Sequence, residues 1–170
     1  MTIDEQPAPP YAIPVEVPVG KTPPVFKDTL QIGIVVRDLD RTMRTYIDDY
    51  GIGPWTVYDF NDETVDEMMV DGEPRGYSMR LAVAMVGKLQ WELIEPTSGD
   101  TIYSRFLAEH GEGVQHIALD VENYQDTVAR LSALGRTSTQ SGRMGGVTYS
   151  YFSTEKDLKV AIELYSRPLN

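Results

Sequence analysis

The sequence contains an internal repeat, and this limits the folds open to the chain more than any other feature. The segment that begins Gln31-Ile-Gly-Ile-Val-Val is matched by one that begins His116-Ile-Ala-Leu-Asp-Val, so position 31 corresponds to position 116. Near the ends of the two copies, Glu92 corresponds to Glu163, so the first copy is slightly the longer one. Such self-similarity predicts two copies of one structural unit that share a core.

Each copy starts with a strand and continues with a helix. Apolar residues alternate with other residues over 30–36, which is typical of a strand with one buried face. Helical spacing follows over 39–50, with Asp38 or Asp40 as N-cap candidate and Gly51 as the stop. The pattern predicts further strands over 55–60, 77–86 and 88–95 and a helix over 101–110. Positions 61–76 show no clear period, so we expect an insertion or mobile loop there.

The N-terminal segment 1–28 differs in texture from the rest. Seven of the eleven prolines fall within positions 1–24, which favours an extended N-terminal arm over helix or strand. This arm is expected either to be a disordered tail or to lie across a dimer partner. We therefore divide the chain into the arm (1–28) and one domain (29–168), made of module one (29–98), a linker helix (101–110) and module two (114–168).

Charge and composition exclude several classes of function. The formal net charge is −11, which argues against binding to nucleic acid or to an anionic membrane. The absence of cysteine excludes disulfides, thiolate metal sites and a cysteine nucleophile. No apolar run is long enough to span a bilayer and no secretory signal is visible, so we expect a soluble cytoplasmic protein.

The repeat places four polar side chains at equivalent positions. Gln31 and His116 lie on the first strand of each module, and Glu92 and Glu163 lie on the last. Their apolar neighbours alternate onto the opposite face, which is the face covered by helices. One nitrogen and three oxygen donors suit a single divalent ion such as Zn, Co, Ni, Mn or Fe. The alternatives are solvent-facing Gln and Glu side chains with a structural histidine, or the relic of a metal site.

Several segments resemble the vicinal oxygen chelate superfamily, which includes glyoxalases, methylmalonyl-CoA epimerases and extradiol dioxygenases. The similar segments are the two strand–helix openings, "WELIEP", "FLAEHGEGVQHIALDV" and "VAIELYSRP". The resemblance implies an α+β fold in which two tandem βαβββ modules form a curved mixed sheet around a metal-binding cavity. It places the metal ligands at Gln31, Glu92, His116 and Glu163, the set typical of zinc glyoxalases.

Two departures from the family patterns narrow the expected activity. Extradiol dioxygenases hold iron with two His and one Glu, whereas Gln31 stands in the first ligand position here. Methylmalonyl-CoA epimerases have an additional carboxylate base on the third strand, where this chain has Arg80, and a CoA substrate also needs basic contacts that an acidic protein does not favour.

The shared chemistry of glyoxalases and epimerases is removal of a proton next to a metal-bound carbonyl. We expect Glu163 as the first candidate for the base and Glu92 as its partner on the opposite side. The reaction would be an isomerisation, an epimerisation or an elimination by a lyase. The expected partner is a small carbonyl compound, hydrophobic or ring-containing. The residues predicted to contact it are Trp55, Met68, Met69, Met79, Arg80, Tyr149 and Tyr151.

Two other functions stay open at this stage. One is a glyoxalase I-like lyase that acts on a thiol adduct. The other is a protein that binds a hydrophobic ligand such as an antibiotic without catalysis. Because a curved sheet exposes strand edges and the family often dimerises, we also expect a homodimer.

Overall fold

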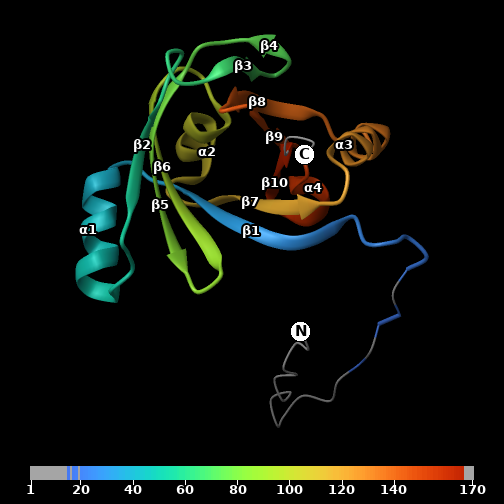
Figure 1. Ribbon diagram of the computed structural model, residues 1–170, viewed down its shortest axis with the longest axis horizontal. Coiled ribbons are helices and arrows are strands. Elements are labelled where there is room, and N and C mark those ends of the chain that lie inside the picture. Colours follow the sequence, from blue (N-terminus) through green and yellow to red (C-terminus); the bar gives the residue numbers. More distant parts are fainter. Residues whose placement is uncertain (1–14, 16, 19, 167–170) are drawn as a thin grey trace.

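A computed structural model describes residues 15, 17, 18 and 20–166, so most of the predicted N-terminal arm lies outside the described residues. Within that part of the chain, ten strands form one mixed sheet in the order β2-β5-β6-β1-β7-β10-β9-β8-β3-β4. The sheet curves strongly, so that its two ends approach each other on its concave side (Figure 1). This confirms the predicted α+β fold with a curved mixed sheet.

Each module contributes one half of the sheet, and the two halves have the same strand order. Module one supplies β1 (Phe26–Val35), β2 (Thr56–Phe60), β5 (Ser78–Val86) and β6 (Leu89–Ser98). Module two supplies β7 (Gly113–Val121), β8 (Ser138–Met144), β9 (Val147–Phe152) and β10 (Ala161–Ser166). The halves join where β1 pairs antiparallel with β7. From this seam outward the order is β1-β6-β5-β2 on one side and β7-β10-β9-β8 on the other.

Strand register reproduces the repeat seen in the sequence. Where β1 pairs with β6, Gly33 lies opposite Glu92. Where β7 pairs with β10, Ala118 lies opposite Glu163. The sequence repeat relates the same positions, because Gly33 corresponds to Ala118 and Glu92 to Glu163. The equivalence therefore holds for individual residues.

Two helices cover the outside of the sheet. Helix α1 (Leu39–Tyr50) starts at Asp38, whose side chain accepts a hydrogen bond from the Arg41 amide, and ends at Gly51 in the left-handed conformation, as predicted. It packs on module one. Helix α3 (Tyr124–Ala133) packs on module two with Asn123 as its N-cap. The short α4 (Glu155–Leu158) precedes β10.

Helix α2 (Ile102–His110) lies inside the curve of the sheet, between the two modules (Figure 1). A capping box between Thr101 and Ser104 fixes its start. Its Tyr103 is fully buried and packs edge-on against Tyr151 of β9. The helix thus packs on the concave side of the sheet, where apolar side chains of both modules surround it.

The segment 61–76 forms strands, which corrects the expectation of a loop without regular structure. It contains β3 (Asp66–Val70) and β4 (Glu73–Pro74), and β3 pairs antiparallel with β8, the outer strand of module two. Module one therefore sends a hairpin to the far edge of the sheet, beyond the strands of module two (Figure 1). Met68 and Val70 of this hairpin are buried in the inner core beside α2.

Candidate functional site

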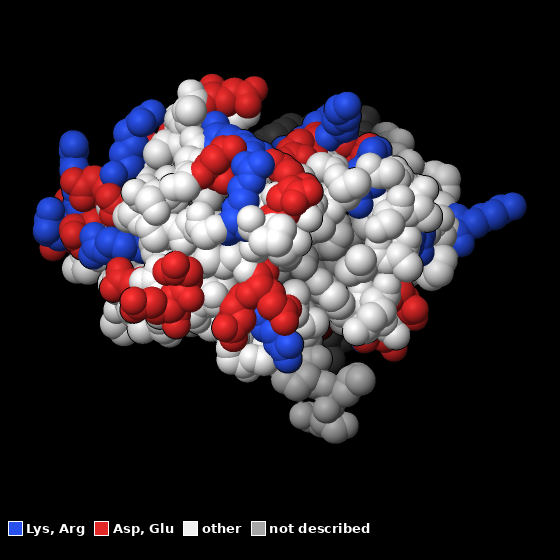
Figure 2. Space-filling model, turned by 90° about the horizontal axis from the view of Figure 1, so that it is seen from above, with Lys and Arg blue, Asp and Glu red and all other residues white. Residues whose placement is uncertain are grey.

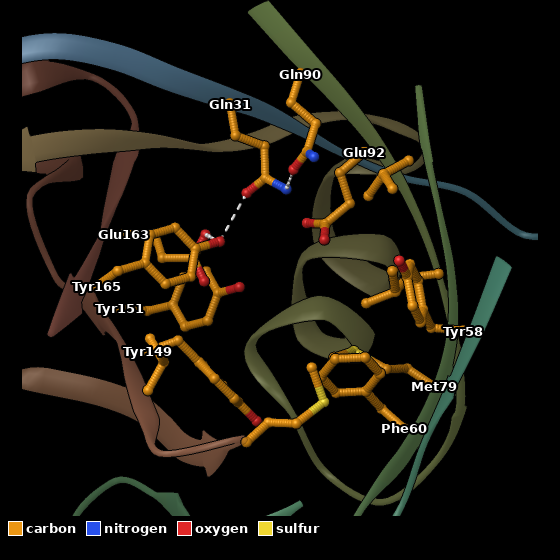
Figure 3. A pocket seen from close by; sticks show the side chains of 14 residues that line it. Gln31, Tyr58, Phe60, Met79, Gln90, Glu92, Tyr149, Tyr151, Glu163 and Tyr165 are labelled. Atoms are coloured by element: carbon orange, nitrogen blue, oxygen red, sulfur yellow. Dashed lines mark hydrogen bonds between the residues drawn. The ribbon is translucent and has the colours of Figure 1, made fainter. Parts of the chain in front are cut away.

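A cavity of about 210 Å³ opens on the concave side of the sheet, where strands of both modules meet. Figure 3 shows the side chains that surround it. The lining residues are Gln31, Tyr58, Phe60, Met79, Leu81, Val83, Gln90, Glu92, Met144, Val147, Tyr149, Tyr151, Glu163 and Tyr165. Three of the four predicted metal ligands are in this set, and the fourth, His116, lies beside two of them.

The four predicted ligands come together at the seam between the modules. His116 is fully buried, and its Nε2 atom lies 3.3 Å from Glu163 Oε2 and 3.6 Å from Glu92 Oε2. Gln31 on β1 is 3% exposed, and its Oε1 is 3.0 Å from the Tyr165 hydroxyl, which also contacts Glu163 Oε2 at 2.9 Å. One strand pair from each module thus supplies two of the donors.

Gly33 makes room for the histidine. It lies opposite His116 across the β1–β7 seam, and a Cβ atom at this position would fall inside the imidazole ring. Any side chain at 33 would therefore displace the ring. The close approach explains why β1 has a glycine in the middle of a strand, where glycine otherwise costs stability.

Burial and neighbouring carboxylates set the charge state of these groups. Burial alone lowers the pKa of His116, but the adjacent carboxylates of Glu163 and Glu92 outweigh it and raise the pKa to about 9. Burial raises the pKa of Glu92, and the charge of Glu163 adds to this against the opposing effect of His116. Burial also raises the pKa of Tyr165 well above its ordinary value, so its hydroxyl stays protonated and can donate.

The donor set fits a divalent metal ion. Donor atoms that share an ion at about 2.1 Å lie about 3 to 3.5 Å from one another, close to the separations around His116 Nε2. Among the described residues, His116 Nε2 and Glu92 Oε2 are buried without a hydrogen-bond partner, and the ion pair between them at 3.6 Å is a contact that a bound ion would replace. No group of three or more His, Cys, Asp or Glu side chains is close enough in this part of the chain to form a ready-made metal site. The fit therefore rests on the types of donor and on the separations around His116 Nε2.

Comparison with protein families assigns the chain. The family model of the Glyoxalase/Bleomycin resistance protein/Dioxygenase superfamily matches residues 30–152. The chain belongs to this superfamily. The resemblance expected from the sequence is thereby confirmed, and the matched region begins in β1 and ends with β9.

Solved structures of the superfamily share the fold. A variant of Streptomyces coelicolor methylmalonyl-CoA epimerase in complex with 2-nitronate-propionyl-CoA is 24% identical, with a TM-score of 0.63 over 85% of this chain and 99% of that one. Methylmalonyl-CoA epimerase from Mycobacterium tuberculosis is 21% identical, with a TM-score of 0.62 over 86% and 91%. A hypothetical protein from Bacillus halodurans is 16% identical, with a TM-score of 0.59 over 84% and 96%. No curated protein sequence matches the chain.

The structure sorts the residues predicted to contact substrate. Met79, Tyr149 and Tyr151 line the cavity. Trp55, Met68, Met69 and Arg80 are not among the residues that line it, so for these four substrate contact stays a prediction without support from the cavity. Trp55 packs on Tyr46 of α1, while Met68 and Met69 belong to the β3–β4 hairpin.

Arg80 lies on the outer face of β5. Its guanidinium forms ion pairs with Asp40 at 3.0 Å and with Glu95 at 3.5 Å. Side chains alternate along a strand, so Met79 and Leu81 face the cavity while Arg80 faces away. Arg80 therefore does not occupy the cavity-facing position that a base on the third strand would need.

Sequence reasoning missed two polar lining residues that period-two spacing could have identified. Gln90 is two positions before Glu92, and Tyr165 is two positions after Glu163, so both share a face with a predicted ligand. Gln115 was also missed. It is adjacent to His116, and alternation gives no signal that its side chain turns back to contact the imidazole.

Acidic and basic side chains are intermingled on the face seen from above in Figure 2. Elsewhere in the described part of the chain, ion pairs join opposite charges in the same way, as where Arg105 pairs with Asp71 at 2.8 Å and with Asp100 at 2.7 Å. No broad basic surface is visible on the described part of that face, in line with the net charge of −11. No helix in the described part of the chain is long and apolar enough to cross a membrane.

Proposed function

We propose that this protein is a divalent-metal-dependent isomerase, epimerase or lyase that removes a proton next to the carbonyl of a small hydrophobic or ring-containing substrate. One observation carries the proposal. Gln31, Glu92, His116 and Glu163 occupy repeat-equivalent positions in two modules and converge beside one cavity. Together these four side chains would hold one ion of the Zn, Co, Ni, Mn or Fe group. When bound, such an ion acts as a Lewis acid that stabilises negative charge on a carbonyl oxygen.

The two glutamates are the proposed proton acceptors. The sequence ranked Glu163 first, but the geometry favours Glu92. Glu163 Oε2 accepts a hydrogen bond from Tyr165, whereas Glu92 Oε2 has no hydrogen-bond partner among the described residues and lies 3.6 Å from His116 Nε2. Burial raises the pKa of Glu92, which makes its carboxylate a stronger base than an exposed one. Because Glu92 and Glu163 come from opposite modules, two faces of a bound substrate lie within reach of a base.

The cavity supports an uncharged substrate of about one ring. Its volume of about 210 Å³ is above the roughly 150 Å³ that holds benzene and below the usual size of drug-binding pockets. No Lys or Arg is among the described residues that line it. A thiol adduct with peptide carboxylates, or a CoA thioester, would therefore find no cationic partner within the cavity itself.

A second candidate is a protein that binds a hydrophobic ligand without turning it over. The aromatic wall of Phe60, Tyr149 and Tyr151 favours this alternative because it would bind a ring with or without an ion. The two functions differ in what they need from the glutamates. Catalysis requires them, whereas binding to the wall does not.

The deciding measurement is metal content by elemental mass spectrometry on protein purified without chelator or affinity tag. We expect about one divalent ion per chain, lost in His116→Ala and in Glu163→Ala. With metal present, carbonyl compounds of one ring are then screened for deuterium exchange from solvent. Wild type without metal, and with no uptake of Zn, Co, Ni, Mn or Fe, would rule out the proposed mechanism and favour the binding protein.

We also propose that the chain forms a homodimer. Strand β2 is an edge of the sheet, and its Val57 and Tyr58 are 42% and 45% exposed. An unpaired strand with apolar side chains favours pairing with another copy. Light scattering after size exclusion tests this: a monomer mass for wild type at micromolar concentration would contradict it.

A further inference from the structure

Three of the four proposed ligands each have a polar neighbour that fixes their orientation. Gln90 contacts Gln31, Gln115 contacts His116, and Tyr165 contacts Glu163 (Figure 3 shows the first and third). We propose that Gln90, Gln115 and Tyr165 are positioning residues that prepare the site for a divalent cation. We call these three residues the outer ring. The inference rests on the proposed function and goes beyond it, because it assigns roles to residues that would not touch the ion.

Gln115 sets which nitrogen of His116 faces the cavity. Its Oε1 atom lies 2.8 Å from His116 Nδ1, and both residues are buried. A glutamine Oε1 can only accept, so Nδ1 must carry the hydrogen. Nε2 is then directed at Glu92 and Glu163. Metal-binding histidines commonly donate their second N–H in this way, which fixes the ring and raises its basicity as a ligand.

Gln90 sets which end of the Gln31 amide faces the site. The Gln31 Nε2 group donates to Gln90 Oε1 at 2.8 Å. Since the nitrogen is engaged there, Gln31 presents Oε1, the only atom of its amide that can bind a cation. A reversed amide would aim two N–H groups at the ion.

Tyr165 joins the two modules at the site. Its hydroxyl lies 2.9 Å from Glu163 Oε2 in module two and 3.0 Å from Gln31 Oε1 in module one. The hydroxyl carries one hydrogen, which these two oxygens share, so Tyr165 ties the side chain of Gln31 to that of Glu163.

The repeat shows that the fold itself does not require these polar groups. The positions equivalent to Gln90, Gln115 and Tyr165 in the other module are Ala161, Leu30 and Ile94. Ala161 and Ile94 are buried, so apolar side chains satisfy the same scaffold positions. At these three pairs of positions, the polar residue therefore occurs only where it touches a proposed ligand.

Glu92 is the exception among the four. Its Oε2 has no hydrogen-bond partner in the described part of the chain. The outer ring thus contacts three of the proposed ligands and not Glu92, which agrees with the choice of Glu92 as proton acceptor. Three fixed donors would keep the ion in place when the fourth moves.

Calorimetric titration of the full chain with Co²⁺ and Zn²⁺ tests whether the outer ring positions the proposed ligands. We expect Gln90→Ala, Gln115→Met and Tyr165→Phe each to weaken binding about 10- to 100-fold. Two controls remove similar groups elsewhere: Tyr124→Phe deletes a hydroxyl that bonds Ser150 at 2.7 Å, and Gln125→Met changes an exposed glutamine. Both controls should bind like wild type. The absorption spectrum of bound Co²⁺ should change in the three ring variants and not in the controls.

The Nδ1–H resonance of His116 provides a readout independent of affinity. In ¹⁵N-labelled, Zn-loaded protein we expect a slowly exchanging Nδ1–H signal, lost in Gln115→Met and restored in Gln115→Glu, which keeps an acceptor. If the outer-ring variants bind Co²⁺ and Zn²⁺ as tightly as wild type, the positioning role of these three residues is wrong and the proposed function is unaffected. If the wild type binds neither ion, both the proposed function and the positioning role are wrong.

Discussion

The two modules share one scaffold and fill it differently. Their strands have the same order and register, yet the cavity wall contributed by β5 is aliphatic, with Leu81 and Val83, whereas β9 contributes Tyr149 and Tyr151. These residues are equivalent, since Val83 lies opposite Glu92 and Tyr151 opposite Glu163. The contribution of β5 to the cavity wall is therefore apolar, whereas that of β9 carries hydroxyl groups.

The difference shows how a repeat produces an asymmetric site. Backbone register fixes where side chains point, and each position can then change alone. Gly142 illustrates this, because a Cβ atom there would overlap the Tyr149 phenol. On the opposite wall the equivalent position is Tyr58, beside the smaller Leu81. In module one the larger side chain of the pair is thus on the outer strand β2, whereas in module two it is on the inner strand β9.

The greatest asymmetry is the β3–β4 hairpin, which only module one has in the described part of the chain, and breaking its packing should have the largest effect. Met68 is 8% exposed and belongs to the inner core. We expect Met68→Ala to cost about 3 kcal/mol of unfolding free energy. Met85→Ala, at an exposed hairpin tip, should cost less than about 0.5 kcal/mol. Urea unfolding measures both, and equal costs would show that the hairpin is not part of the core.

Exchanging the equivalent residues Gly33 and Ala118 should affect the modules unequally. Gly33→Ala places a methyl group inside the His116 ring, so we expect a loss of about 2 kcal/mol in stability together with loss of metal binding. Ala118→Gly creates no clash and should cost about 0.5–1 kcal/mol through backbone entropy. Thermal unfolding and Zn²⁺ titration report the two effects. Wild-type metal affinity in Gly33→Ala would contradict the packing described at the seam.

The tyrosine wall should depend on its own hydrogen bonds. Tyr77 and Tyr149 share a hydrogen bond of 2.7 Å in the inner core, and Tyr77→Phe leaves the buried Tyr149 hydroxyl without this partner. We expect a cost of about 1 kcal/mol. Tyr58→Phe, at a residue on the other wall that is nearly half exposed, should change stability little. If the denaturant midpoint shifts equally in both variants, the Tyr77–Tyr149 hydrogen bond does not contribute more to stability than the exposed Tyr58 hydroxyl.

The smallest effect concerns an ion pair outside the site in each module. Hydrogen bonding to Arg80 lowers the pKa of Asp40, and hydrogen bonding to Arg136 lowers that of Asp157. A lowered folded-state pKa adds stability above the unfolded value of about 3.9, and this is lost as the pH falls through the folded value. Asp40→Asn and Asp157→Asn should therefore be less stable than wild type at pH 7 and converge with it near pH 2. A stability difference that persists at pH 2 would contradict this origin.

The sequence predicted those parts of the fold that short-range patterns govern. Alternation identified β1, and Asp38 and Gly51 marked both ends of α1. The repeat located all four candidate ligands, because equivalent strands place them on one face. Local periodicity and long-range similarity were sufficient here.

The β3–β4 hairpin was missed for a physical reason. Between Asp66 and Met69 the pairing with β8 shifts register, and Glu67 has a φ of 53° in the left-handed region. This irregularity interrupts the alternation that would mark a strand. For Arg80 the sequence did not fix the register, and a shift of one residue exchanges the two faces of a strand, so the pattern alone could not decide between Arg80 and its neighbours Met79 and Leu81 on the cavity side.

The route of the β3–β4 hairpin also constrains how the chain can fold during synthesis. The partner strand of β3 is β8 (Ser138–Met144), so residues 66–74 leave the ribosome long before their place in the sheet exists. Strands β1, β2, β5 and β6 can pair as soon as module one is complete, but the hairpin must wait for most of module two. Such a distant contact carries a high loop-closure cost, which places closure of the cavity last and makes it the slow step. The nascent chain thus exposes Met68 and Val70 until the second half arrives.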